Sequence, residues 1–352
     1  MLGSMSNDES VIAALRTVKY PGYSRDIVSF GLVKTARNEG HRIFVELQLS
    51  AGTPALAQQL RSECEKALAT FPNAPKVEVE VLIPSAAATS ARGVNAWTQQ
   101  NGVPGIRHVV AVASGKGGVG KSTVSVNLAC ALHQIGLKTG LLDCDIYGPS
   151  IPLMMGAHEK PQLTEDDKMI PIRRHGVSLM SMGFLLDGDT PVIWRGPMIM
   201  KTIQQFVTQV EWGELDCLLV DLPPGTGDAQ LSLCQTVPLD GGVVVTTPQE
   251  ASLGVVRKGI AMFEKVSVPI LGIIENMSYF TAPGGERVEI FGHGGGRSEA
   301  ARRNIPFLGE IPIFTQIREG GDQGIPITAS APESVPGRFF LELARSLQKR
   351  LK

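Results

Sequence analysis

The sequence contains few of the residues on which specialised folds depend. Only five of its 352 residues are cysteine, an odd number, and no two of them form a CxxC pair. A secreted scaffold held together by disulfides is therefore not expected. Aromatic residues make up only 5% of the chain, so stacking of nucleic-acid bases on exposed rings is not expected to be its main activity. The cysteines are Cys64, Cys130, Cys144, Cys217 and Cys234.

The chain also lacks a charge excess and a long apolar run. Its formal net charge is −1, which gives no global sign of a protein that binds nucleic acid or a membrane surface. We find no signal peptide and no apolar run long enough to span a bilayer, so a cytoplasmic protein is predicted. Residues 1–9 begin with MLGSMS, which resembles a cloning remnant ahead of Met5, and they are expected to contribute nothing to the fold.

The remaining sequence divides into a small front domain and a large back domain. Residues 10–84 have the pattern helix, strand, strand, helix, strand, which predicts a small α+β domain. Residues 85–106 are rich in Ala, Ser, Thr, Gly and Gln without apolar periodicity, and they predict a flexible linker. The elements expected in the front domain are a helix from Val11, an apolar strand from Ile27 to Val33, alternating strands at His41–Ser50 and Lys76–Ile83, and a helix at Ala55–Phe71.

Residues 107–352 alternate short Val, Ile and Leu runs with helical segments. This pattern predicts an α/β fold with a mostly parallel sheet covered by helices on both faces. The loop motif described next makes the P-loop NTPase type of this fold the expected one. The C-terminal run FFLELARSLQKRLK places Phe340, Leu343, Leu347 and Leu351 on one helix face, for which packing on the sheet is favoured over membrane contact. The expected strands begin at His108, Thr139, Val177, Leu215, Gly241 and Pro269.

The strongest motif follows the first of these strands. SGKGGVGKST, from Ser114 to Thr123, matches G-x-x-x-x-G-K-[ST] and precedes an apolar helix, which is the context that a phosphate loop requires. Its glycines allow backbone N–H groups to turn toward phosphate oxygens, and the helix N-terminus adds positive potential. We predict an ATPase in which Lys121 contacts the β- and γ-phosphates and Ser122 binds Mg²⁺. The residues predicted to bind ATP are Gly115, Lys116, Gly117, Gly118, Val119, Gly120, Lys121, Ser122, Thr123 and Asn276.

Acidic residues end two further strands. Asp143 and Asp145 close LLDCD, and the carboxyl ends of parallel strands flank the ligand crevice. Asp145 is predicted to orient the attacking water and Asp143 to assist near Mg²⁺, although Asp is also common where a strand turns. Asp221 follows four apolar residues in the Walker-B pattern, which predicts a carboxylate that holds Mg²⁺, partly through water. Asn276 follows a later strand, where its amide suits either an adenine edge or a turn.

KGGVGKS also resembles the deviant phosphate loop of the MinD, ParA and nitrogenase-iron-protein class of ATPases. In that class the first lysine of the loop reaches across a nucleotide-sandwich dimer to the phosphates of the partner. The resemblance therefore implies a homodimer and a catalytic role for Lys116 beside Lys121 and Asp145. A solvated surface lysine is the simpler interpretation of Lys116.

Six motifs in order extend the resemblance over nearly the whole chain. GKGGVGKST, LLDCDIYGPS, WRGPM, DLPPGTGD, NMSYF and IFGHGGG are together similar to the Mrp/ApbC family of cytosolic ATPases, which act as iron–sulfur cluster carriers. The front domain, with DIVSFGLV, resembles the iron–sulfur-assembly domain often fused to them. The resemblance implies ATP at a dimer interface, a bridging 4Fe–4S cluster and apoprotein clients.

One departure from that family concerns the cluster ligands. Carriers of the family usually have a CxxC soon after MSYF, but this chain continues FTAPGGERVEIFG, with Ala282 where the first cysteine would stand. The front domain has Thr53 before Pro54 where its usual cysteine would stand. Cys144, Cys234 or His293 remain as substitutes, although buried residues and a mobile glycine loop are the simpler interpretations. No metal site for the cluster is therefore assigned.

Three functions compete on this evidence. The first is an ATP-hydrolysing cluster carrier that delivers clusters to apoproteins. The second is an ATPase switch that serves another client without holding a cluster itself. The third is a ParA- or MinD-like positioning ATPase, against which WRGPM and the front domain argue.

Overall fold

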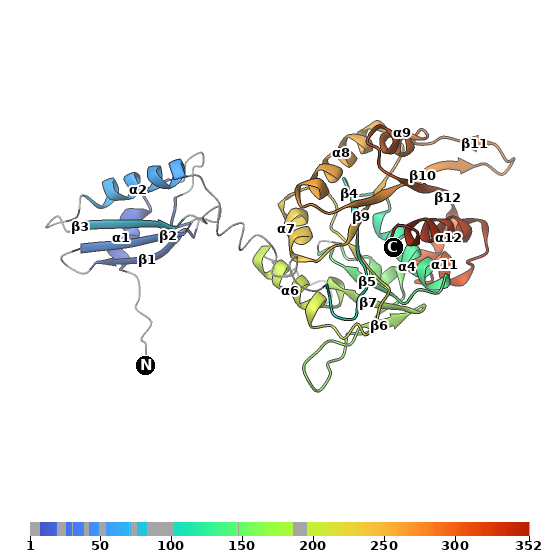
Figure 1. Cartoon of the computed structure of the whole chain (residues 1–352), viewed down its shortest axis with the longest axis horizontal. Coiled ribbons are helices and arrows are strands. Elements are labelled where there is room, and N and C mark those ends of the chain that lie inside the picture. Colours follow the sequence, from blue (N-terminus) through green and yellow to red (C-terminus); the bar gives the residue numbers. More distant parts are fainter. Residues whose placement is uncertain are drawn as a thin grey trace. The chain divides into compact units, whose positions relative to one another are not determined.

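A computed structural model of the chain describes residues 8–19, 26–29, 31–38, 42–48, 54–69, 71, 76–82, 102–146, 148–185 and 196–351. It divides into two compact units, Met1–Ala96 and Trp97–Lys352 (Figure 1). The residues at the predicted cysteine position of the front domain (Thr53), most of the predicted linker, and Trp194 and Arg195 of WRGPM lie outside the described residues. Val103 and Ile106, at the end of the predicted linker, are buried in the core of the large unit.

The small unit is a three-stranded sheet with two helices on one face. Strand β2 lies between β1, which is antiparallel to it, and β3, which is parallel. Helix α2 packs on β3, and α1 packs on β1 and on α2. Alternation along β2 buries Ile43, Val45 and Leu47 against these helices. The elements are α1 (Glu9–Leu15), β1 (Val33–Asn38), β2 (Arg42–Gln48), α2 (Pro54–Leu68) and β3 (Lys76–Leu82).

The first strand of this unit begins at Val33, so the predicted apolar strand from Ile27 is wrong. Residues 27–29 form a turn in which the Asp26 carboxylate accepts the backbone N–H of Ser29 at 2.8 Å. Ile27 is fully buried from this turn. Strand β1, VKTARN, buries only Ala36 among its six residues, so its sequence has little of the alternation by which strands are recognised.

The described residues of the large unit contain a nine-stranded sheet in the order β11-β10-β9-β4-β8-β5-β7-β6, with β12 also paired to β10. Strands β6 and β11 are antiparallel to their neighbours, and the other pairings are parallel, as the sequence predicted. The strands are β4 (Val109–Ser114), β5 (Thr139–Asp143), β6 (Ile172–Arg174), β7 (Val177–Ser181), β8 (Cys217–Asp221), β9 (Gly241–Thr246), β10 (Ile270–Thr281), β11 (Arg287–Val288) and β12 (Phe307–Ile313).

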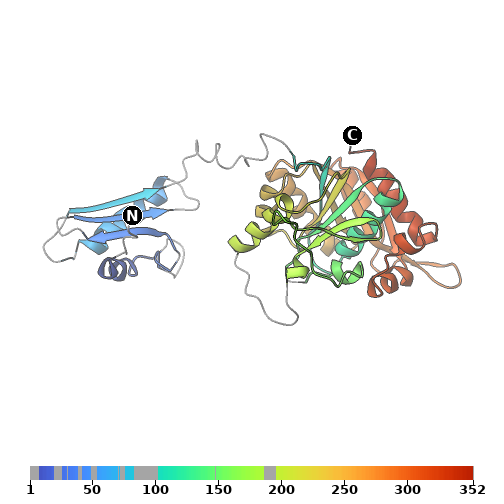
Figure 2. The same ribbon diagram turned by 90° about the horizontal axis from the view of Figure 1, so that it is seen from below.

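Helices cover both faces of this sheet (Figures 1 and 2). The layer around α4 contains α5, α10, α11 and α12, and the opposite layer contains α6, α7, α8 and α9, as their mutual contacts require. Two layers of helices on a mainly parallel sheet confirm the predicted α/β architecture. The helices are α4 (Lys121–Gln134), α5 (Ile151–Met154), α6 (Gly196–Thr208), α7 (Asp228–Thr236), α8 (Glu250–Lys265), α9 (Gly295–Arg302), α10 (Thr315–Asp322), α11 (Ile327–Ser330) and α12 (Val335–Gln348).

The C-terminal helix α12 packs inside this architecture. Phe340, Leu343 and Leu347 are buried, and α12 contacts α4 and β12. The packing interpretation of its apolar face is thereby confirmed. Among the described helices, none combines the length and apolar character that crossing a bilayer requires.

Strand β10 is longer than its sequence suggested. Its parallel pairing with β9 ends at Glu275, but the strand continues to Thr281 because β12 and β11 pair with its second half. Asn276 therefore lies within a strand, and its expected position at the carboxyl end of one is wrong. The backbone is irregular here, since Met277 has φ 55° and the register with β12 shifts between Asn276 and Phe280.

Candidate nucleotide site

The phosphate loop connects the central strand β4 to the N-terminus of α4. Gly118 and Gly120 have φ of 79° and 77°, in the left-handed region that favours glycine. A Cβ at Gly120 would also collide with the Asn276 amide nitrogen, and one at Gly115 would lie 2.6 Å from the backbone of Val255. The glycines of the motif thus serve both backbone conformation and close packing against β10 and α8.

A buried ion pair lies at the start of α4. The Lys121 ammonium lies 2.5 Å from Oδ2 of Asp221, and the two side chains are only 6% and 0% exposed. The Ser122 hydroxyl donates to the same carboxylate oxygen at 2.7 Å. Ser125, which sequence reasoning missed, donates to Oδ1 of Asp221 at 2.5 Å. It lies one helical turn after Lys121, and this i, i+4 spacing was the available signal.

Asp143 and Asp221 are register partners on the adjacent strands β5 and β8. Asp143 is fully buried, and its carboxylate accepts the Ser181 hydroxyl at 2.8 Å and the Asp145 N–H at 3.0 Å. Burial, followed by the nearby Asp221 carboxylate, raises the pKa of Asp143 to about 7. Asp143 therefore holds the backbone of Asp145 in place through this hydrogen bond. Ser181, on β7, gave no recognisable sequence signal because its role depends on strand order.

Asp145 is half-buried and lines a cavity of about 220 Å³ at the phosphate loop. Lys116, Lys121 and Ser122 line the same cavity, as does Pro224 of the loop after β8. Within the described part of the chain, no carboxylate lies within salt-bridge distance of the Lys116 ammonium, whereas Lys121 is paired. The predicted residues from Lys116 to Thr123, together with Asp145, thus line one small polar cavity. Gly115, Asp143 and Asp221 are not among its lining residues.

A second, apolar cavity of about 640 Å³ adjoins the first. The two share Gly120, Thr123, Ser150 and Met154 in their walls. Asn276 stands at the junction, where its amide donates to the carbonyl of Val119 at 2.9 Å. The rest of the apolar cavity is formed mainly by Met277, Ile290, Phe291, Pro312, Ile313, Phe314 and Ile317.

The loop after β8 is attached to the phosphate loop. The N–H of Gly225 donates to the carbonyl of Ser114 at 3.1 Å. The buried amide of Gln230, on α7, donates to the carbonyl of Pro223. The loop after β8 is therefore hydrogen-bonded to the end of β4, where the phosphate loop begins, and to α7.

Comparison with known proteins agrees with this geometry. A family model described as NUBPL iron-transfer P-loop NTPase matches residues 105–348. The chain belongs to this family. In this NUBPL-type NTPase, residues 8–81 match a second model, described as iron–sulfur cluster assembly protein. The resemblance to the Mrp-type iron–sulfur ATPases is thereby confirmed for both units.

Two relatives span nearly the full length of the NUBPL-type chain. The iron–sulfur cluster carrier protein of Synechocystis sp. is 42% identical, with 97% of each chain covered. That of Deinococcus radiodurans is 44% identical, covering 97% of this chain and 94% of its own. A solved nucleotide-binding protein from Archaeoglobus fulgidus, in complex with ADP and with Co, is 40% identical with a TM-score of 0.60. It covers 68% of this chain and 93% of its own.

All five cysteines of this NUBPL-type NTPase are buried and free. Burial raises the pKa of the thiols of Cys64, Cys130, Cys217 and Cys234 to about 12. Burial and the charge of Asp143 raise the pKa of the Cys144 thiol well above its usual value. Since thiolates are the ligands of iron–sulfur clusters, these cysteines do not fit a cluster as they stand.

Proposed function

We propose that this NUBPL-type NTPase binds ATP with Mg²⁺, hydrolyses it as a cytoplasmic homodimer, and uses the cycle to transfer iron–sulfur clusters to apoproteins. One observation carries the ATPase part of the proposal. Lys121, Ser122 and Asp221 converge within hydrogen-bond distance at a polar cavity that adjoins an apolar one. The polar cavity suits phosphates and the apolar cavity suits a base.

The phosphate end supplies charge and hydrogen-bond donors. Lys121 would exchange Asp221 for the β- and γ-phosphates, and the N–H groups of the loop and of the α4 N-terminus would hold the remaining oxygens. The oxygens of Ser122 and Asp221 are of the kind that Mg²⁺ prefers, and they already lie 2.7 Å apart. When bound, Mg²⁺ would neutralise charge on the transferred phosphoryl group.

Hydrolysis is assigned to Asp145 and Lys116. Asp145 faces the cavity while Asp143 holds its backbone N–H, so Asp145 is suited to orient the attacking water. The Lys116 ammonium borders the cavity from the glycine loop and is suited to reach the phosphates of a second copy. The role of Lys116 rests on the resemblance of KGGVGKS to the deviant phosphate loop of the MinD and ParA class. Asn276 and the apolar cavity would hold the adenine.

The cluster is treated as cargo rather than as a resident cofactor. The names of the full-length relatives favour a carrier over an ATP switch that serves another client. The five buried thiols do not supply an accessible ligand set, so the proposal includes no step through them. Cluster ligands would come from a client or from a conformation that exposes Cys144 or Cys234.

The experiment combines ATP hydrolysis with anaerobic reconstitution of the full chain. We expect Mg²⁺-dependent hydrolysis together with weak or no stable cluster binding, and ATP-dependent activation of an apo 4Fe–4S client when clusters are supplied. A stable visible absorption band with about four irons per dimer would contradict the ligand argument, and Cys144→Ala or Cys234→Ala would then identify the ligand. A client activated equally without ATP and without this protein would contradict the transfer function.

A further inference from the structure

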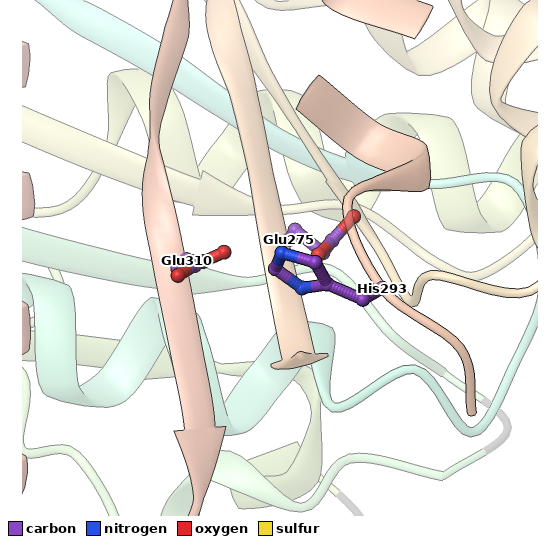
Figure 3. Close-up of side chains that lie close together, drawn as sticks. All are labelled: Glu275, His293 and Glu310. Carbon is purple, nitrogen blue, oxygen red and sulfur yellow. The ribbon is translucent and has the colours of Figure 1, made fainter. Parts of the chain in front are cut away.

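Three metal-ligating side chains converge on the far side of β10 from the phosphate loop. They are Glu275 on β10, Glu310 on β12 and His293 in the loop before α9 (Figure 3). One oxygen or nitrogen atom from each lies within 4.8 Å of the other two. Side chains alternate along a strand, so Glu275 and the neighbouring Asn276, which contacts Val119, point to opposite faces. This cluster of three side chains is therefore distinct from the nucleotide site.

The fold holds two of the three residues firmly. Glu275 and Glu310 are register partners on parallel strands, which places their carboxyl groups side by side. Glu275 is fully buried and accepts the N–H groups of Gly294 at 3.1 Å and Gly296 at 2.6 Å. These bonds attach the glycine loop to β10 and bring His293 over the carboxyl pair.

The charge balance of the cluster favours a cation. Glu275 is compensated by the backbone N–H groups at the start of α9. Oε2 of Glu310 is buried and has no hydrogen-bond partner among the described residues. A buried carboxylate oxygen without a partner is destabilising, and a second carboxylate beside it adds repulsion. A bound cation would satisfy this oxygen and separate the two charges.

Arg287, the arginine that contacts His293, does not satisfy that oxygen. Nη2 of Arg287 lies 2.6 Å from Nδ1 of His293, and its guanidinium group stacks on Tyr279 at 3.7 Å from the ring centre. The Arg287 side chain is 41% exposed and is also within 4.0 Å of Glu289. Arg287 thus competes for the imidazole from the solvent side, and its exposure allows it to move away.

We propose that Glu275, His293 and Glu310 bind a divalent first-row transition-metal ion. Two carboxylates and one imidazole suit such an ion better than Mg²⁺ or Ca²⁺, which prefer oxygen alone. Metal–ligand distances of about 2.0–2.2 Å require the three groups to close together slightly. His293 can make this movement because it is exposed and lies between Gly292 and Gly294, both with positive φ. Water would complete the coordination.

The test is a titration of the metal-free full chain with Co²⁺, followed by calorimetry and visible absorption. Neither nucleotide nor an iron–sulfur cluster is present. The wild-type chain should bind a single Co²⁺ ion without a thiolate-to-cobalt band. His293→Ala and Glu310→Gln should each weaken binding by at least about tenfold. Arg287→Gln should tighten it, because it removes the competing cation. Glu286→Gln, at an exposed position of the same hairpin, is the matched control and should change Kd by no more than about twofold.

Several results would overturn the site. The first is no Co²⁺ binding by the wild-type chain, and the second is wild-type Co²⁺ affinity in His293→Ala and in Glu310→Gln. The third is a thiolate-to-cobalt absorption band, which would report cysteine ligands. Unchanged circular dichroism and thermal unfolding in all variants would show that the fold is retained. Should one loss variant unfold, the gain in Arg287→Gln still decides, since unchanged affinity there contradicts the proposed competition. The outcome does not depend on the proposed ATPase function, because no nucleotide is used.

Discussion

The two ends of the candidate nucleotide site are built on opposite principles. The phosphate end is small and polar, and its charged groups are fixed by short contacts among Lys121, Ser122, Ser125 and Asp221. The base end is nearly three times larger and mainly apolar, and several of its side chains, such as Ile290 and Phe291, are 54% and 37% exposed. Charge at fixed positions is expected to determine turnover, whereas apolar area at adaptable positions is expected to determine affinity.

The largest effect is expected at the centre of the phosphate end. Lys121→Ala removes the main cation for the phosphates and should lower ATP turnover by at least about a hundredfold, measured as phosphate release. Lys138→Ala is the matched control, because that side chain is 66% exposed, pairs with exposed Glu214 and does not line the polar cavity. Since the change also leaves Asp221 buried without its cation, thermal unfolding should be recorded in parallel. Equal turnover in variant and wild type would remove the phosphate-loop assignment.

A smaller loss is expected at the edge of the polar cavity. Asp145→Asn should slow hydrolysis by roughly ten- to a hundredfold, because the water loses its orienting carboxylate. Nucleotide affinity should stay nearly unchanged, since the phosphate contacts remain. Asp166→Asn, at an exposed loop position, serves as control. Normal hydrolysis in Asp145→Asn would reduce Asp145 to a turn residue.

The role of Lys116 is tested by mixing variants. Lys116→Ala and Lys121→Ala should each hydrolyse ATP poorly alone. If Lys116 acts across a dimer, a mixed dimer has one site that lacks both lysines and one that keeps both, so part of the activity returns. A pull-down through a tag carried by one variant alone would confirm that mixed dimers form. Mixed dimers without recovered turnover would show that Lys116 does not act across the interface.

The smallest effect is expected at the base end. Phe291→Ala removes one wall of the apolar cavity and should raise the KM for ATP by about two- to fivefold with kcat unchanged, the pattern of uniform binding. Val335→Ala is the control, since Val335 is 63% exposed and is not among the residues that line the cavity. A fall in kcat without a change in KM would indicate that the apolar cavity contributes to the chemical step, and the contrast between the two ends would fail.

The sequence predicted those parts of the site whose residues follow one another along the chain. The phosphate loop, Asp145 and Asp221 are recognisable because a strand, a motif and a helix follow one another along the chain. The bonds from Ser125 to Asp221 and from Ser181 to Asp143 depend on strand order, which no local pattern specifies. The convergence of Glu275 with Glu310 depends on the register of β10 and β12. The first strand of the small unit was misplaced because β1 is mostly polar, whereas the turn at Ile27 is apolar.

Asp143 has a consequence for the dependence of stability on pH. Its pKa is about 7 in the folded chain and starts from an ordinary value of 3.8. Between these two values the folded chain retains a proton that the unfolded chain has lost. The contribution of this carboxyl to the free energy of unfolding is therefore unchanged below about pH 4 and falls as pH rises toward 7, by on the order of 4 kcal/mol in total. Denaturant titrations at several pH values give the free energy of unfolding as a function of pH, and its slope against pH should differ between wild type and Asp143→Asn. Parallel pH dependences would mean that Asp143 ionises normally.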